Sequence, residues 1–182
     1  GFIHGVMNTD NMAVSGETID YGPCAFIDGY SPKAVYSSID RAGRYAYEQQ
    51  PSMAHWNLAQ LGSCFVPQME AELGGQQQAI EALTEILNSF PDLYQAQWRA
   101  VFGAKLGIAD PQDADVALIQ ELLGLMAKDG ADFTNTFRGL LDGTARDWVL
   151  DRAGFDLWAE RWQDRRAPDW QEIIAKASPA VI

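Results

Sequence analysis

Helical periodicity runs almost without interruption from about residue 68 to the end of the chain, and this feature limits the possible folds most strongly. The stretch 77–90 carries an apolar residue at every third or fourth position, which indicates an amphipathic helix: Ile80, Leu83, Ile86 and Leu87. Pro91 suits the first turn of a following helix that runs to about Leu106. The stretch 113–128 repeats the pattern, and Gly130 stands where a glycine cap is expected. Shorter helices are expected over 132–141, 147–152 and 155–166 and from about Asp169, so the chain is predicted to be mainly α.

Residues 1 to about 66 differ in character, because they are rich in Gly, Tyr, Asn and Asp and show little helical periodicity. Two short apolar runs, 12–14 and 17–19, flank Ser15-Gly16, and this pattern predicts a small β-hairpin. The stretch 23–50 is long and irregular, and loops of this length are usually functional. A helix is expected over 54–61.

The charge of the chain limits its partners. It has 13 basic and 25 acidic residues and a formal net charge of -12, which argues against nucleic acid and against an anionic membrane surface. No apolar run is long enough to span a bilayer. If the protein handles a polyanion such as a nucleotide, a metal ion is expected to mediate the contact. Cys24 and Cys64 are too few for a zinc site or a disulfide scaffold, which favours a reducing compartment, although a single disulfide between them stays open.

The chemistry-bearing residues lie around the predicted hairpin. Asp10 and Asn11 are adjacent before it, and Asp20 follows it. Mg²⁺ prefers oxygen ligands, and a hairpin can bring Asn11 and Asp20 face to face as two of them. Asp10 is then the candidate acid or base, directed at an incoming hydroxyl. The plainer interpretation is that Asp10 and Asn11 form an ordinary turn.

Protein kinases arrange similar parts in the same order: a His, an Asn, a hairpin and an Asp-Phe-Gly triplet. Here His4, Asn11 and Asp20-Tyr21-Gly22 follow that order, but Val6 occupies the place of the kinase base. This departure makes the resemblance more specific than one to kinases in general. The run from His4 to Asn11 resembles the catalytic loop of the selenoprotein O family. Four further runs are also similar to that family: 18–23, 40–45, 50–51 and 55–59. The runs 132–134 and 137–138 show a weaker similarity.

The resemblance implies the C-terminal lobe of a protein-kinase-like fold that transfers AMP from ATP to Ser, Thr or Tyr hydroxyls of proteins. By the same resemblance, Asn11 and Asp20 hold Mg²⁺ or Mn²⁺, Asp20 also lies at the ATP, and Asp10 is the proton acceptor. Residues 1–66 would supply the catalytic loop, the hairpin and an activation-segment-like region, and 67–182 the helical part of the same lobe. The bacterial cytoplasm is the expected location, or the mitochondrion for a eukaryotic source.

Several readings stand beside this one. His4 is interpreted as an orienting loop residue and His55 as structural, and Arg41 and Arg44 as either phosphate contacts or structural residues. The chain contains no Gly-rich phosphate loop and no Val-Ala-Ile-Lys-like strand, which in the family precede this region, so it is expected to be an inactive fragment by itself. The alternatives are a kinase-fold phosphotransferase, against which Val6 speaks, and a catalytically dead pseudokinase or helical interaction module.

Overall fold

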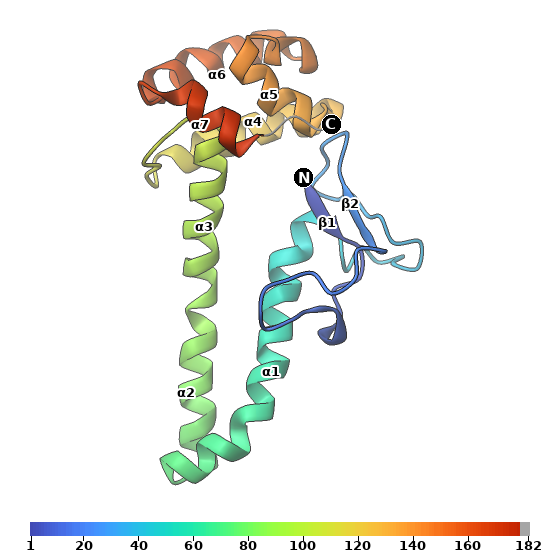
Figure 1. Cartoon of the computed structure of the whole chain (residues 1–182), viewed down its shortest axis with the longest axis vertical. Helices are drawn as coiled ribbons and strands as arrows, with labels where there is room; N and C mark the ends of the chain where they lie inside the picture. Colours follow the sequence, from blue (N-terminus) through green and yellow to red (C-terminus); the bar gives the residue numbers. More distant parts are fainter. Residues whose placement is uncertain (179–182) are drawn as a thin grey trace. The chain divides into compact units, whose positions relative to one another are not determined.

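The computed structural model describes residues 1–178 and is mainly helical, as the sequence predicts (Figure 1). Two strands, β1 (Phe2–His4) and β2 (Cys24–Phe26), form a small antiparallel sheet. The helices are α1 (Gln50–Leu73), α2 (Gln76–Asn88), α3 (Phe90–Lys105), α4 (Asp115–Asp129), α5 (Phe133–Asp142), α6 (Arg152–Arg165) and α7 (Trp170–Ala177). Three short 3₁₀ turns are η1 (Thr9–Asn11), η2 (Tyr47–Gln49) and η3 (Ala145–Trp148). No helix among the described residues is both long and apolar enough to cross a membrane.

The residues group into two compact units. The first, here called the loop unit, comprises Phe2–Ala25 and Lys33–Gln95; the second, the C-terminal unit, comprises Gly1, Phe26–Pro32 and the chain from Ala96 onward. The division falls within α3. All three candidate site residues lie in the loop unit.

The loop unit is built on α1 and α2, which pack along each other (Figure 1). Gly74 ends α1 in the left-handed region at φ 80°, and its N–H donates to the carbonyl of Glu70, so the chain reverses within a short turn. Helix α1 is much longer than the predicted helix over 54–61. It starts with Pro51 in its first turn, where no N–H is needed, and it continues through Pro67, although a proline lacks one backbone donor.

The predicted hairpin is present only in reduced form. Instead of two strands, the segment forms the single antiparallel bridge Met12–Thr18 around a tight turn, in which the N–H of Gly16 donates to the carbonyl of Ala13 at 3.0 Å. Val14 and Ile19 are 87% and 57% exposed, so these two of the apolar residues that suggested strands pack against no core. The regular strand pair lies instead at β1 and β2, where Ile3 is fully buried.

The core of the C-terminal unit is formed by apolar faces of four helices. Its fully buried members include Ile119, Leu122 and Met126 of α4, Phe137 of α5, Trp158 of α6 and Ile174 of α7. Two indole N–H groups are satisfied inside it: Trp158 donates to the carbonyl of Leu118 at 2.9 Å, and Trp162 to that of Leu106 at 2.7 Å. Gly130 and Gly143 end α4 and α5 in the left-handed region, which confirms the predicted cap at Gly130.

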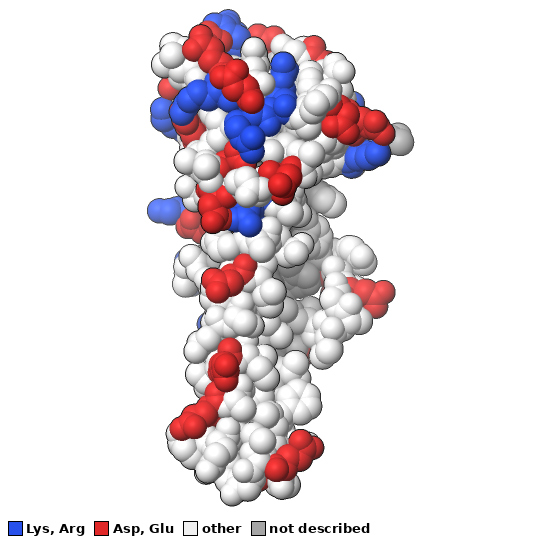
Figure 2. Space-filling model, turned by 90° about the vertical axis from the view of Figure 1, so that its left-hand side faces the viewer, with Lys and Arg blue, Asp and Glu red and all other residues white. Residues whose placement is uncertain are grey.

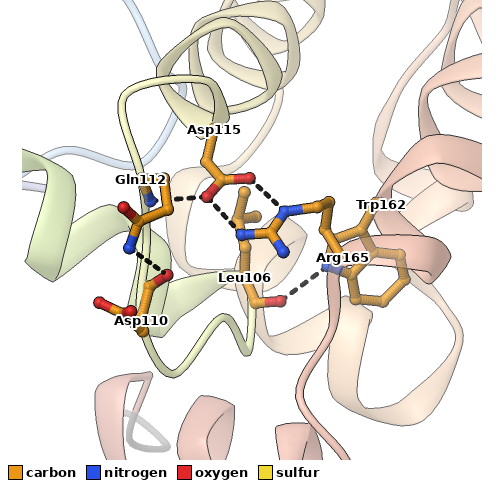
Figure 3. Close-up of polar contacts among 6 residues, drawn as sticks. All are labelled: Leu106, Asp110, Gln112, Asp115, Trp162 and Arg165. Carbon is orange, nitrogen blue, oxygen red and sulfur yellow. Dashed lines mark hydrogen bonds and ion pairs between the residues drawn. The ribbon is translucent and has the colours of Figure 1, made fainter.

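The buried carboxylate of Asp115 links two helices of this core, α4 and α6. Figure 3 shows Asp115, at the start of α4, accepting hydrogen bonds from Nε and Nη2 of Arg165 at 2.5 and 2.6 Å. The same carboxylate accepts the N–H of Gln112 at 2.7 Å. The Arg165 guanidinium and the Gln112 N–H hold the pKa of Asp115 below its usual value. This network is structural, and it ties α6 to the start of α4.

Candidate functional site

The candidate loop starts at the end of β1 and reaches the 3₁₀ turn η1. His4 is buried, and its Nδ1 accepts the N–H of Val6 at 3.2 Å. This contact agrees with the interpretation of His4 as an orienting loop residue. Further along, the N–H of Asn11 donates to the carbonyl of Asn8 at 3.0 Å and closes η1, which leaves Asp10 exposed and Asn11 half-buried.

The Met12–Thr18 bridge decides how the site residues are arranged. Asn11 immediately precedes one bridge residue, and Asp20 follows the other by two positions. In an antiparallel pair the two chains leave the bridge side by side. Asn11 and Asp20 therefore lie at the open end of the hairpin, away from the turn at Ser15-Gly16. That they share one metal ion stays a prediction.

The carboxylate of Asp20 is held by its own backbone. Its Oδ1 accepts the N–H of Gly22 at 2.8 Å, a local turn that fixes the orientation of the side chain. Within residues 1–178, Oδ2 accepts no hydrogen bond and the residue is exposed. One carboxylate oxygen is thus oriented and available to a ligand.

The surroundings of the neighbouring thiol favour its protonated form. Cys24 lies four residues after Asp20 and donates to its carbonyl at 3.5 Å. Burial and the nearby negative charge of Asp20 raise the pKa of Cys24, and it is the thiolate that reacts. Both Cys24 and Cys64 are free cysteines, so the disulfide left open by the sequence does not form.

The segment 40–45 supports the loop from a second direction. The Asp40 carboxylate accepts the N–H groups of Arg44 and Tyr45 at 2.9 and 2.7 Å, and these bonds, that from Tyr45 first, lower the pKa of Asp40. The turn presents the buried Tyr45, whose hydroxyl donates to Oδ1 of Asn8 at 2.5 Å. The guanidinium of Arg44 lies 4.9 Å from the ring centre of Trp56, which favours the structural reading of this arginine.

The donor set of the candidate site suits a hard cation bound together with a nucleotide. Among residues 1–178 no group of three or more His, Cys, Asp or Glu side chains is arranged to hold a metal. Asn11 and Asp20 offer one amide oxygen and one carboxylate, which are ligands that Mg²⁺ accepts while it keeps waters and phosphate oxygens. These residues therefore fit a metal that arrives with phosphate, rather than a permanent protein-only site.

A cavity of about 360 Å³ in the loop unit lies between α1, α2 and the start of α3. It is not a nucleotide site, because its lining is almost wholly apolar: Leu58, Leu61, Gly62, Phe65, Leu83, Ile86, Leu87, Ser89, Phe90 and Leu93. Residues 45–98 contain no Lys or Arg. Figure 2 shows acidic and no basic side chains over α2 on the face drawn, which disfavours binding of a polyanion on this face.

Comparison with known proteins gives a consistent result along the chain. The family described as protein adenylyltransferase SelO matches residues 1–180. A protein nucleotidyltransferase YdiU of Ruegeria sp. (strain TM1040) is 52% identical over 184 residues, covering 100% of this chain and 38% of that protein. Proteins of the same name from Bradyrhizobium diazoefficiens and Lachnoclostridium phytofermentans are 50% and 52% identical, over 97% and 100% of this chain and 37% and 38% of their own length. The chain thus spans less than two fifths of the length of these relatives.

Proposed function

Because the chain belongs to the protein adenylyltransferase SelO family, we propose that it supplies the catalytic loop of an enzyme that transfers AMP from ATP to Ser, Thr or Tyr hydroxyls of proteins. The observation that carries the proposal is the Met12–Thr18 bridge, since it brings Asn11 and Asp20 to the same end of the hairpin with Asp10 exposed beside them.

The roles follow from the chemistry of each group. Asn11 and Asp20 would hold Mg²⁺ or Mn²⁺, and Asp20 would also lie at the ATP. A divalent metal bound there would neutralise charge on the phosphate oxygens. Asp10 makes no side-chain hydrogen bond within the described residues, so its carboxylate is free to accept the proton of an acceptor hydroxyl.

The reaction balances with these groups alone. The acceptor oxygen attacks the α-phosphorus of ATP and forms a new P–O bond, while its proton passes to Asp10. The bond between the α-phosphorus and the bridging oxygen breaks, and pyrophosphate leaves with that electron pair. Transfer of this kind depends mainly on positioning and charge neutralisation, which a loop fixed at several points can provide.

The fold assignment belongs to the same proposal. We regard the chain as the C-terminal lobe of a protein-kinase-like fold, with residues 1–66 carrying the site and 67–182 the helical remainder. The curated relatives named above are bacterial, so the cytoplasm of a bacterium is the proposed location. Protein substrates and ATP are the proposed partners, and nucleic acid and membranes are not.

The decisive experiment identifies which phosphate of ATP reaches protein. The chain is joined to those parts of the Ruegeria sp. relative that it does not cover, and this joined protein receives ATP labelled either at the α- or at the γ-phosphate. Retention of the α-label alone supports AMP transfer. Retention of the γ-label would instead indicate a kinase, and retention of neither by a folded joined protein would favour an interaction module.

The site assignment has its own control. Asp20→Ala should abolish labelling, because it removes a metal ligand. Glu17→Ala removes an exposed carboxylate from the same hairpin and should leave labelling unchanged. Full activity in Asp20→Ala would refute the assignment.

A further inference from the structure

We propose that Gln50 and Asn57 of α1 are positioning residues that hold the loop bearing Asp10 and Asn11, an inference that rests on the function proposed above. The two residues lie seven positions apart, and Met53 lies between them at three positions from Gln50. That spacing places all three on one face of the helix. Met53 and Asn57 are only 7% and 6% exposed, so this face is the buried one.

Gln50 binds the start of the loop through both ends of its amide. Its Oε1 accepts the N–H of His4 at 3.0 Å, and its Nε2 donates to the carbonyl of Phe2 at 3.2 Å. Nε2 also donates to the carbonyl of Tyr47 at 3.3 Å. A side chain that both accepts and donates is needed here, and among residues of this length only glutamine does so.

Asn57 binds the loop just before η1. Its Nδ2 donates to the carbonyl of Met7 at 3.0 Å and contacts Sδ of Met12. Its Oδ1 is buried and has no hydrogen-bond partner in the described part of the chain. A buried polar atom without a partner destabilises a protein, so packing alone would favour an apolar residue at this position. The amide is explained by its hold on the Met7 carbonyl.

These contacts fix the loop on both sides of the candidate catalytic residues. Gln50 binds Phe2 and His4, Asn57 binds Met7 and Met12, and the exposed residues Asn8, Thr9 and Asp10 lie between the last two of these anchors. Because Met12 is also a member of the bridge to Thr18, a shift of the loop would move Asn11 relative to Asp20. Helix α1 thereby sets the geometry of the site without touching the reacting atoms.

The test compares Gln50→Leu, Gln50→Glu and Asn57→Leu with Gln60→Leu, which replaces an exposed glutamine of the same helix. The first readout is amide hydrogen exchange over residues 2–12 in the 182-residue chain. Gln50→Leu and Asn57→Leu should speed exchange in this loop, while Gln50→Glu keeps the acceptor and should preserve protection of the His4 amide. Gln60→Leu should change nothing.

The second readout is the divalent-metal requirement of the protein joined to the regions of the Ruegeria sp. relative. Loss of a group that orients metal ligands typically weakens metal affinity roughly 10- to 100-fold, so Gln50→Leu should raise the half-saturating Mn²⁺ concentration by about tenfold. A merely structural residue would lower the amount of folded enzyme but not shift this concentration. Gln50→Glu keeps the acceptor for the His4 N–H but loses the donor to the carbonyls of Phe2 and Tyr47, so its Mn²⁺ requirement should lie between those of the unsubstituted protein and Gln50→Leu.

Different results would overturn the positioning role of α1 and the proposed function. Unchanged exchange and an unchanged Mn²⁺ requirement in Gln50→Leu would overturn the positioning role. Absence of AMP transfer in the unsubstituted joined protein would overturn the proposed function, while the exchange data would still test the hold on the loop. If circular dichroism shows that Asn57→Leu does not fold, the positioning role is tested by the comparison of Gln50→Leu with Gln50→Glu.

Discussion

At the scale of single residues, the candidate base Asp10 differs from Asp20, the proposed metal ligand, in what surrounds it. Asp20 is oriented by the N–H of Gly22, whereas Asp10 lies exposed on η1 with no side-chain partner within residues 1–178. A carboxylate with a fixed orientation suits the binding of a cation in one geometry. A carboxylate without a partner suits a base that accepts a proton only when a substrate hydroxyl is bound.

Asp10→Asn tests this distinction. Removal of a general base should reduce the rate of AMP transfer by roughly 10²- to 10⁴-fold. The Mn²⁺ concentration for half-maximal rate should change little, because Asn11 and Asp20 remain. Initial rates of the joined protein across a metal titration separate the two parameters, with Glu17→Gln as the control carboxylate. An unchanged rate in Asp10→Asn would support the ordinary turn.

Asp115 provides a residue-scale prediction for stability against pH. Because Arg165 and the Gln112 N–H lower its pKa in the folded state, its contribution is complete above the unfolded value of about 3.9. The contribution is lost as the pH falls below that value and through the lowered folded pKa. Urea unfolding followed by tryptophan fluorescence should therefore show a loss of stability as the pH falls below about 4.

Asp115→Asn should lower stability near neutral pH and flatten this acid dependence. Asp115 is 3% exposed but Arg165 is 45% exposed, so solvent screens the pair and the expected loss is about 1–2 kcal/mol. The surface pair Arg146–Asp156 is the control, because both side chains are about half exposed. Asp156→Asn should have a much smaller effect, and an equal effect would contradict the importance assigned to burial.

At the scale of elements, sequence patterns predicted the helices far better than the strands. The apolar stripe and the glycine after it predicted α4 to within two residues at its start and one at its end, over Asp115–Asp129. The predicted strands 12–14 and 17–19 were wrong apart from one bridge. A stripe of apolar residues over several helical turns indicates that a whole face of the helix is buried. Three apolar residues in a row do not indicate what they will pack against.

A glycine inside α5 tests the packing of that element. A Cβ on Gly139 would lie 2.5 Å from the backbone N and 2.7 Å from the Cα of Ala145 in η3. Gly139→Ala should therefore destabilise the chain by about 1–3 kcal/mol through overpacking, although alanine favours a helix. Thermal unfolding by circular dichroism measures the change.

Gly124 within α4 is the matched control, because a Cβ there would meet nothing within 4 Å. Gly124→Ala should stabilise the chain by about 0.5–1 kcal/mol, the usual gain in helix propensity. Opposite signs for the two glycines are the expected result. Stabilisation by Gly139→Ala would show that η3 moves aside without loss.

At the scale of the whole chain, the sequence offered candidates for the chemistry but not the residues that contact their loop. Asp10, Asn11 and Asp20 could be proposed because their order and spacing follow a motif within one short stretch. Gln50 and Asn57 were not, since each binds a partner 46 or 50 positions away, and Tyr45 binds Asn8 at 37 positions. Such pairs depend on how α1 packs, which local patterns do not contain.

The largest-scale prediction concerns the 182-residue chain by itself. Its candidate site offers one amide and one or two carboxylates, and residues 45–98 contain no Lys or Arg. Without a Gly-rich loop to hold the phosphates, the net charge of -12 repels ATP. We therefore expect no AMP transfer and only weak ATP binding by the isolated chain.

Calorimetric titration with Mn²⁺ and ATP, together with labelling by α-labelled ATP, measures both expectations. The joined protein serves as the positive control, and its Asp20→Ala variant as the negative one. Because a metal at Asn11 and Asp20 needs phosphate oxygens to complete its coordination, Mn²⁺ should bind the isolated chain more weakly than it binds the joined protein with ATP. Measurable AMP transfer by the isolated chain would show that these residues position the nucleotide unaided, and the regions present only in the longer relatives would then be dispensable for the chemistry.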